Sequence, residues 1–494
     1  MKRSSGVLLH ITSLPGRYGV GTLGNHARRF ADFCHQAGLS WWQILPVGPA
    51  GNGNSPYQSD SVFAGNPDLI DLEQLIEWGL LKREECDRLD WGSHADEVCF
   101  EKLHRNQPQL LRLAFARAKQ DSALWEQVQR FVAEQDWLDD YALYLALKQQ
   151  MGGKPWQQWD APLAKRDRQT LKLWKERLQE EMEYHCWVQY LFFEQWAKLK
   201  EYCNRKGVRL IGDIPIYVAL DSADAWAEPQ LFQFDEELNP VAVAGCPPDA
   251  FSATGQLWGN PLYRWEYHRQ TGYAWWIRRI AQCLNLYDCI RIDHFRGFDE
   301  YYSIPAGDET AEHGHWEPGP SMSLMQALKD ALGNVNVIAE DLGFLTDGVR
   351  RLLYDSGFPG MKVIQFAFDS REESDYLPHN YEKNCVVYTG THDNDTLCGW
   401  YKVLDPEDLK LSQKYMNNAN TPKRQIHWDF IRLALASVAD LCIIPLQDYL
   451  GLGSEARINT PSTLGNNWRW RMKQGCLTKE LADQIRELTT LYGR

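Results

Sequence analysis

Eight short runs of apolar and β-branched residues recur along this chain of 494 residues. Most of them are nearly continuous in apolar residues rather than alternating, which is typical of parallel strands buried on both faces of a sheet. Stretches with helical periodicity separate most of the runs, which predicts an α/β fold, a (β/α)8 TIM barrel with helical insertions. The runs lie at residues 6–14, 41–48, 208–218, 287–295, 336–342, 361–368, 385–393 and 438–450.

The spacing between these runs is uneven, which predicts insertions in a single catalytic domain that covers residues 1–494. Residues 50–207 separate the second run from the third and are rich in helical patterns, so we expect a mainly helical insertion there. Residues 219–270 carry many proline and glycine residues and few periodic runs. Such a segment is typical of a functional loop, and we expect a loop-rich insertion over the active site.

Bulk composition argues against several classes of protein. The formal net charge of −14 argues against tight binding to nucleic acid. No window approaches the ~20 apolar residues of a membrane-spanning helix, and the first residues, MKRSSGVLLHITSLPG, are interpreted as a strand rather than as a signal peptide. The twelve cysteines are scattered and form no CxxC pair, which favours thiols over disulfides or a zinc site. These features predict a cytoplasmic protein.

Residues 19–24 read GVGTLG, a literal GxGxxG between a predicted strand and a predicted helix. Taken alone, this pattern indicates a dinucleotide-binding site and an NAD-dependent oxidoreductase. Residues 15–18 separate the glycines from the strand, however, whereas the fingerprint requires an immediate turn. About 20 positions after the last glycine stand Ile, Leu and Pro, with no acidic residue for the ribose. We therefore interpret the segment as a flexible loop and predict no cofactor.

Acidic residues follow four of the predicted strands at their carboxyl ends, where barrel enzymes place their chemistry. One such residue alone is more often a cap or a surface residue. Four together are difficult to explain by packing, because a buried unpaired carboxylate is costly, and they predict a catalytic site. The four are Asp213, Asp293, Glu340 and Asp393.

Two of these carboxyl groups differ in their surroundings. Arg291 stands two residues before Asp293, so both side chains point to one face of a strand, and the cation favours the ionised carboxylate that a nucleophile requires. Glu340 follows the apolar NVIA and precedes Asp341, which predicts a raised pKa and a proton ready for donation. A nucleophile and an acid of this kind are the pair that retaining glycoside chemistry needs.

The segment THDND, residues 391–395, admits three interpretations: a metal site, a sugar-binding site or a capped turn. A metal site needs three or four converging ligands, and the RIDHF segment offers too few partners beside an arginine that would repel a cation. No HExxH pattern is present. We therefore expect His392 and Asp393 to contact a sugar, Asp395 to belong to a turn or to support the site, and no metal to bind.

Long segments along nearly the whole chain carry a family resemblance: GVLLHITSLPG, SPYQSDSVFAGNPDLIDL, IGDIPIYVALDSAD, GCPPDAFSATGQLWGNPLY, RIDHFRGF, IAEDLG, GFPGMKVIQFAF, YTGTHDNDT and EARINTP. The chain resembles the 4-α-glucanotransferases (amylomaltase or disproportionating enzyme), which form glycoside hydrolase family 77 in the α-amylase clan. The third strand reads DIPIYV, without the histidine that the wider clan carries close after its aspartate, which favours the transferase branch.

The resemblance implies roles for individual residues. Asp293 would be the nucleophile, Glu340 the acid/base catalyst and Asp393 the residue that stabilises the transition state. A second group would bind the substrate, some of its members around one glucose unit and others in a loop over the glucan. This group comprises Tyr57, Asp213, Asp249, Trp258, Asn260, Arg291 and His392.

The predicted activity is the transfer of α-1,4-glucan segments from a donor to the 4-hydroxyl of an acceptor glucan or glucose, with maltooligosaccharides and α-glucans as the molecules bound. A retaining double displacement requires the Asp293 and Glu340 carboxyl groups to lie about 5 to 5.5 Å apart. That transfer dominates over hydrolysis is implied by the resemblance alone. An α-1,4-glucan hydrolase of the α-amylase clan shares the same catalytic residues and stays open as the alternative; a noncatalytic glucan-binding protein should have lost one of them.

Overall fold

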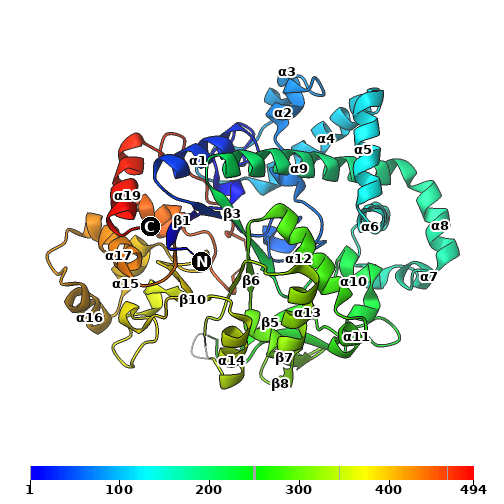
Figure 1. Ribbon diagram of the computed structural model, residues 1–494. Coiled ribbons are helices and arrows are strands. Elements are labelled where there is room, and N and C mark those ends of the chain that lie inside the picture. Colours follow the sequence, from blue (N-terminus) through cyan, green and yellow to red (C-terminus); the bar gives the residue numbers. More distant parts are fainter. Residues whose placement is uncertain (1, 249–251, 344, 464) are drawn as a thin grey trace.

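The protein, described by a computed structural model that covers residues 2–248, 252–343, 345–463 and 465–494, is built on a barrel of eight parallel strands (Figure 1). The order of the strands in the sheet is β10-β11-β12-β1-β2-β3-β6-β9. The strands are β1 (Ser4–Leu8), β2 (Trp41–Gln43), β3 (Arg209–Pro215), β6 (Cys289–Asp293), β9 (Val337–Ala339), β10 (Gly360–Val363), β11 (Cys385–Tyr388) and β12 (Leu441–Pro445).

The sheet nearly closes on itself, which confirms the predicted (β/α)8 barrel. β1 pairs with β12 on one side and with β2 on the other, both in parallel. Where the ladder is interrupted between β9 and β10, the Ala339 amide donates a hydrogen bond of 3.0 Å to the carbonyl of Pro359. Each predicted run overlaps one strand and extends beyond its carboxyl end, because the apolar residues continue into the turn that follows; β1 and β10 begin before their runs.

Helices with an apolar face cover the outside of the barrel. In α1, the buried Ala27, Phe30 and Cys34 follow the spacing of one helical face, and the helix ends before Gly38, which has φ 72°. The helices that follow barrel strands are α1 (Asn25–Gln36), α12 (Ala274–Leu286), α13 (Met322–Leu332), α14 (Asp347–Ser356), α15 (Leu397–Val403), α16 (Pro406–Met416), α17 (Ile426–Ala436), α18 (Leu446–Tyr449) and α19 (Lys479–Leu491).

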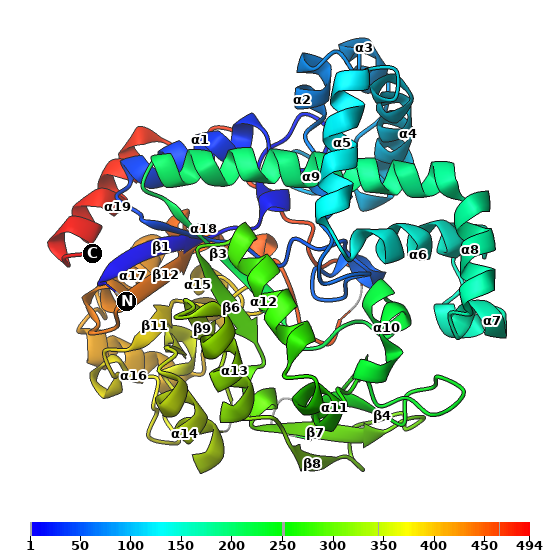
Figure 2. The same cartoon turned by 45° about the vertical axis from the view of Figure 1, so that its right-hand side comes forward.

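The segment between β2 and β3 is helical. Its longest helix, α9, has 27 residues and spans about 40 Å; Figures 1 and 2 show it crossing the molecule beside α1 before the chain enters β3. The helices of this segment are α2 (Leu72–Glu77), α3 (Arg83–Asp87), α4 (Phe100–Ala118), α5 (Ser122–Glu134), α6 (Leu138–Gln150), α7 (Ala161–Ala164), α8 (Arg168–Arg177) and α9 (Gln179–Arg205).

A second, antiparallel sheet lies at the end of the molecule opposite α1 and α9 (Figure 2). Its strand order is β5-β4-β7-β8, so strands from residues 219–270 pair with strands that follow β6. The elements of this region are α10 (Ala223–Ala227), β4 (Ala242–Cys246), β5 (Gln256–Pro261), α11 (Trp265–Gln270), β7 (Glu300–Pro305) and β8 (His315–Pro318). Among the described residues, no helix combines the length and the apolar character needed to cross a bilayer.

Candidate active site

Three of the predicted acidic residues lie on neighbouring strands at the same end of the barrel. Asp213 is in β3, Asp293 is the last residue of β6, and Glu340 directly follows β9. β3 and β6 are paired so that Pro215 lies opposite Asp293, and the Glu340 amide donates to the Ile292 carbonyl at 3.0 Å. The parallel register therefore brings these side chains to one edge of the sheet.

Arg291 is shared between two of the carboxylates. Its Nη1 atom lies 2.7 Å from Asp213 Oδ2 and 3.0 Å from Asp293 Oδ1. Arg291 and Asp213 are buried, whereas the side chain of Asp293 is 32% exposed. Burial raises the pKa of Asp213, and the nearby guanidinium opposes that shift. The arrangement thus leaves Asp293 as the accessible member of the group, with a cation at one of its oxygens.

Glu340 is held by the backbone rather than by a basic side chain. Its Oε2 accepts from the amide of His294 at 2.7 Å, and its Oε1 accepts from the amide of Leu342 at 2.9 Å. Burial and the negative charge of Asp293 raise its pKa to about 7. The adjacent Asp341 directs its Oδ1 to the Met361 amide at 2.6 Å, so the anion that acts on Glu340 is Asp293.

Tyr57, His392 and Asp393 add a second set of side chains at the same end of the barrel. The hydroxyl of Tyr57 donates to Asp213 Oδ2 at 2.9 Å, and its ring stacks on the imidazole of His392 with centroids 4.9 Å apart. His392 Nε2 lies 3.3 Å from Oδ1 of Asp393, whose side chain is 44% exposed. A continuous chain of contacts therefore links Asp393 to Asp213 and, through Arg291, to Asp293.

The second insertion contributes Trp258 of β5. Its ring meets the imidazole of His294 edge to face, with centroids 4.9 Å apart. Asn260 is buried, and its amide nitrogen donates to the carbonyl of Val218 at 2.7 Å, which commits that nitrogen to the fold. Asp249, predicted to bind substrate from the same insertion, lies outside the described residues.

The structure also places residues here to which the sequence assigned no role. Asn459 donates to Asp393 Oδ1 at 2.6 Å, and Arg457 donates to the Asp393 carbonyl at 2.6 Å. The ring of Trp468 lies 6.0 Å from that of Tyr57 and 5.9 Å from that of His392. The only sequence signal for Arg457 and Asn459 was the segment EARINTP, and Trp468 lies outside it, since a contact between residues more than 60 positions apart leaves no local pattern.

Asp395 lies outside this set of contacts. Its two carboxylate oxygens accept from the hydroxyl of Ser454 at 2.6 Å and from the amide of Thr396 at 2.7 Å. It therefore fixes the turn that carries His392 and Asp393. Within the described ranges, no three His, Cys, Asp or Glu side chains converge as ligands of a metal ion would.

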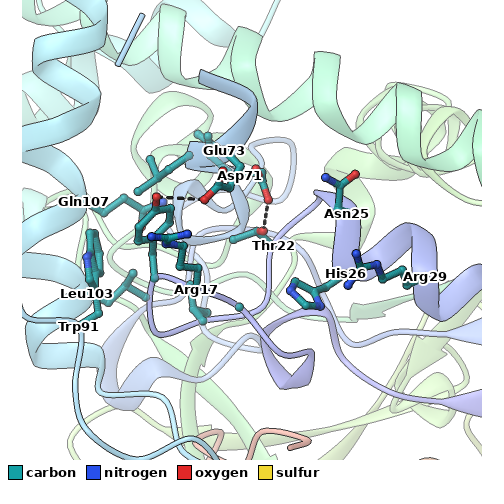
Figure 3. A pocket seen from close by; sticks show the side chains of 15 residues that line it. Arg17, Thr22, Asn25, His26, Arg29, Asp71, Glu73, Trp91, Leu103 and Gln107 are labelled. Carbon is teal, nitrogen blue, oxygen red and sulfur yellow. Dashed lines mark hydrogen bonds between the residues drawn. The ribbon is translucent and has the colours of Figure 1, made fainter. Parts of the chain in front are cut away.

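A separate pocket of about 220 Å³ lies between α1, α2 and α4 (Figure 3). Several of its charged groups have protein partners: Thr22 donates to Asp71 at 2.5 Å, Tyr18 donates to Glu73 at 3.0 Å, and Arg17 pairs with an aspartate on α3 at 2.8 Å. None of the predicted site residues lines this pocket. The carboxylates at the strand ends are therefore the candidate active site.

Comparison with known proteins agrees with this geometry. The sequence model of the family described as 4-alpha-glucanotransferase matches residues 9–478. The chain belongs to the 4-alpha-glucanotransferase family. A 4-alpha-glucanotransferase from Clostridium butyricum is 46% identical over 491 residues, which cover 98% of this chain and 100% of the relative. One from Thermus thermophilus is also 46% identical, over 503 residues that cover 100% of this chain and 99% of the relative.

The structural comparison gives the same family. An amylomaltase from Streptococcus agalactiae, solved in complex with acarbose, superposes with a TM-score of 0.97 at 40% sequence identity, and each chain is covered completely. An amylomaltase from Corynebacterium glutamicum superposes with a TM-score of 0.79 at 20% identity, covering all of this chain and 75% of the other. The second likeness concerns the fold alone.

Proposed function

We propose that this member of the 4-alpha-glucanotransferase family, a glycosyltransferase acting on α-1,4-glucans, works by a double displacement between Asp293 and Glu340. The observation that carries the proposal is the pair itself: two carboxyl groups at the ends of adjacent strands, one beside Arg291 and one with a pKa raised to about 7. Two carboxyl groups in such different surroundings are what a nucleophile and an acid catalyst require.

In the first step, an Asp293 carboxylate oxygen attacks the anomeric carbon of a glucose unit. Glu340 gives its proton to the glycosidic oxygen, and the fragment with the reducing end leaves with a new 4-hydroxyl. The bond that breaks is the α-1,4 linkage, and the bond that forms is a β-glucosyl ester on Asp293. Glu340 is then an anion.

In the second step, the 4-hydroxyl of an acceptor glucan approaches the same carbon. Glu340 removes its proton, the acceptor oxygen attacks, and the Asp293 carboxylate leaves. Two inversions retain the α configuration. Each transfer breaks one α-1,4 linkage and makes one, so the number of reducing ends does not change.

The residues around the pair are proposed to hold the glucose unit whose linkage is cleaved. Asp393, with its side chain 44% exposed, stabilises positive charge on the ring as the leaving group departs. Tyr57, Asp213, Arg291 and His392 form a hydrogen-bonded set around that position.

Transfer also requires that water be kept from the ester while an acceptor binds. The second insertion supplies Trp258, an apolar ring held against His294. Burial lowers the pKa of His294 to about 4, so this imidazole is uncharged at neutral pH, and the two rings form an uncharged aromatic wall next to Asp293. We propose that this wall covers the bound glucan.

Incubation with maltotriose tests the proposed activity. The expected result is a series of shorter and longer maltooligosaccharides together with glucose, at a constant total concentration of reducing ends. Asp293→Ala, which removes the attacking oxygen, is the matched control and should yield no products. A rise in reducing ends in step with product formation would instead identify a hydrolase.

We further propose a reducing compartment such as the cytoplasm. Eight cysteines are buried thiols without a disulfide partner. An oxidising compartment selects structural disulfides, whereas thiols persist where the cell keeps them reduced.

A further inference from the structure

Asp393 is anchored by a residue from a distant part of the chain. The Nδ2 atom of Asn459 donates to Asp393 Oδ1 at 2.6 Å, and His392 Nε2 lies 3.3 Å from the same oxygen. Both partners therefore act on Oδ1, and Oδ2 has no hydrogen bond from a described residue. One oxygen of the carboxylate is fixed to the protein, and the side chain as a whole is still 44% exposed.

Arg457 supports the Asn459–Asp393 contact by binding the backbone carbonyl groups of both residues. Its Nη2 atom donates to the carbonyl of Asp393 at 2.6 Å, and its Nε atom donates to the carbonyl of Asn459 at 2.7 Å. One guanidinium thus bridges the two residues that the side-chain hydrogen bond joins. This bridge sets the distance between the Asn459 amide and the Asp393 carboxylate.

The segment that begins at Asn459 returns to the site through Trp468. The Trp468 amide donates to the carbonyl of Ile458 at 2.7 Å, which closes the base of the segment. The Trp468 ring then lies within about 6 Å of the rings of Tyr57 and His392, as the centroid separations of 6.0 and 5.9 Å show. The segment therefore touches Asp393 at one end and the Tyr57–His392 stack at the other.

We propose that Asn459 is a positioning residue that holds the Asp393 carboxylate in the orientation needed at the transition state. The inference rests on the proposed role of Asp393, which it deepens. A carboxylate that acts on charge developing in the sugar ring works only at the correct distance and angle, and a displacement of about 1 Å can cost about 100-fold in rate. Asn459 would therefore affect the rate of the chemical step more than the binding of glucan.

Two substitutions of Asn459 separate positioning from space filling. Asn459→Ala removes the N–H donor, and Asn459→Asp keeps the size of the side chain but places a second carboxylate against Asp393. We expect kcat for maltotriose disproportionation to fall by about 100-fold in the alanine variant, with KM nearly unchanged, and further in the aspartate variant. If Asn459 only filled space, the alanine variant would lose thermal stability but keep the wild-type kcat once folded.

A matched control lies seven positions further on. Asn466 is exposed on the same segment, and Asn466→Ala makes the same truncation away from Asp393. Its kcat should equal that of the wild type. Circular dichroism and the thermal midpoint show whether each variant is folded.

A double-mutant cycle with Asp393→Asn tests whether Asn459 acts through Asp393. With α-maltotriosyl fluoride as an activated substrate, Asn459→Ala should cause no further loss in the Asp393→Asn background. Losses that multiply, or a folded Asn459→Ala with wild-type kcat, would overturn the positioning role. Full activity of Asp393→Asn alone would instead overturn the role proposed for Asp393, so the two failures are distinguishable.

Discussion

Glu340 shows how the surroundings of a carboxyl group change its pKa. Two backbone amides donate to its carboxylate and favour the charged form, as does the charge of Arg291. Burial and the negative charge of Asp293 act in the opposite direction and prevail, which raises the pKa to about 7. Burial is thus the main reason why the proposed acid holds its proton, and the charge of the nucleophile beside it adds to the effect.

The first prediction at this scale concerns pH. Because Glu340 must carry a proton in the first step, kcat/KM for maltotriose should be highest below its pKa and should fall about tenfold per pH unit above pH of about 7. With α-maltotriosyl fluoride the first step needs no acid. When fluoride release is used to measure that step, its rate should therefore not fall above pH of about 7. A maltotriose profile that stays flat through this range would contradict the assignment of Glu340.

The second prediction concerns the leaving group. Glu340→Gln cannot donate a proton, so transfer from maltotriose should fall by at least about 10²- to 10⁴-fold. Release of fluoride from α-maltotriosyl fluoride in a single turnover should be nearly unaffected, because fluoride leaves without protonation. Asp293→Ala is the contrast, since it should abolish both. Equal losses of Glu340→Gln on the two substrates would contradict its role as the acid.

The proximity of the carboxylates at the strand ends could be predicted from the sequence, because parallel strands place their carboxyl ends at one end of a barrel. The sequence also predicted that the pKa of Glu340 is raised, but it named Asp341 as the nearby anion. In the structure, the Asp341 side chain accepts a hydrogen bond from the Met361 amide instead. The sequence did not predict the contact of Asn459 with Asp393. Residues on separate loops meet only through the closed barrel, which the local pattern does not encode.

At the scale of elements, the position of β3 depends on a close approach to Tyr287. A Cβ atom at Gly212 would lie 2.2 Å from the ring of Tyr287, which is buried and packs edge to face on Trp196 with centroids 5.8 Å apart. The ring has no free space to move into. Asp213 follows Gly212 directly. The close packing of Gly212 on Tyr287 therefore also helps to fix where the Asp213–Arg291 ion pair lies in the barrel.

Gly212→Ala should therefore destabilise the protein by about 1–3 kcal/mol, since it overpacks this contact. The measurement is the thermal midpoint, which should fall relative to the wild type. Adding Tyr287→Leu to the Gly212→Ala variant removes the ring that the new methyl group meets. The double variant should therefore recover part of the lost thermal stability. An unchanged midpoint in Gly212→Ala would show that the contact is not tight.

The elements themselves were predictable to different degrees. The eight barrel strands coincide with apolar runs, because strands covered on both faces leave a strong signal. The four strands of the second sheet were not identified from sequence: β4 and β5 lie in a segment rich in proline and glycine, and β8, with residues that are half-buried or exposed, lacks the apolar run of a buried strand. β4 also pairs with β7, whose residues lie about 60 positions away along the chain, so no local pattern marks that pairing.

At the scale of the whole molecule, the barrel and the helical segment share one main apolar core, which also includes part of the second sheet; the rest of that sheet forms a separate small apolar cluster. Most cysteines lie within it; those buried are Cys34, Cys86, Cys186, Cys203, Cys283, Cys289, Cys385 and Cys442. Burial raises the pKa of these thiols, for example that of Cys289 to about 12, which keeps them protonated and unreactive.

These eight cysteines should resist alkylation by iodoacetamide in the native protein and react only after unfolding. Mass spectrometry of peptides from the native and the denatured protein measures both states. The thermal midpoint should be the same with and without dithiothreitol, because the fold does not depend on disulfides among these residues. Rapid native labelling of Cys203 or Cys442 would contradict the packing described for α9 and β12.

The central claim is that transfer occurs in two displacements, with Asp293 as the nucleophile and Glu340 as the acid and base. Trapping the glycosyl-enzyme intermediate tests this claim most directly. In Glu340→Gln, α-maltotriosyl fluoride should form the ester but lack the base that activates an acceptor, so the glycosyl-enzyme should accumulate. Peptide mass spectrometry should then find a maltotriosyl group on Asp293 and none in Asp293→Ala/Glu340→Gln. A glycosyl group on another residue, or turnover to an inverted product without any adduct, would contradict the account.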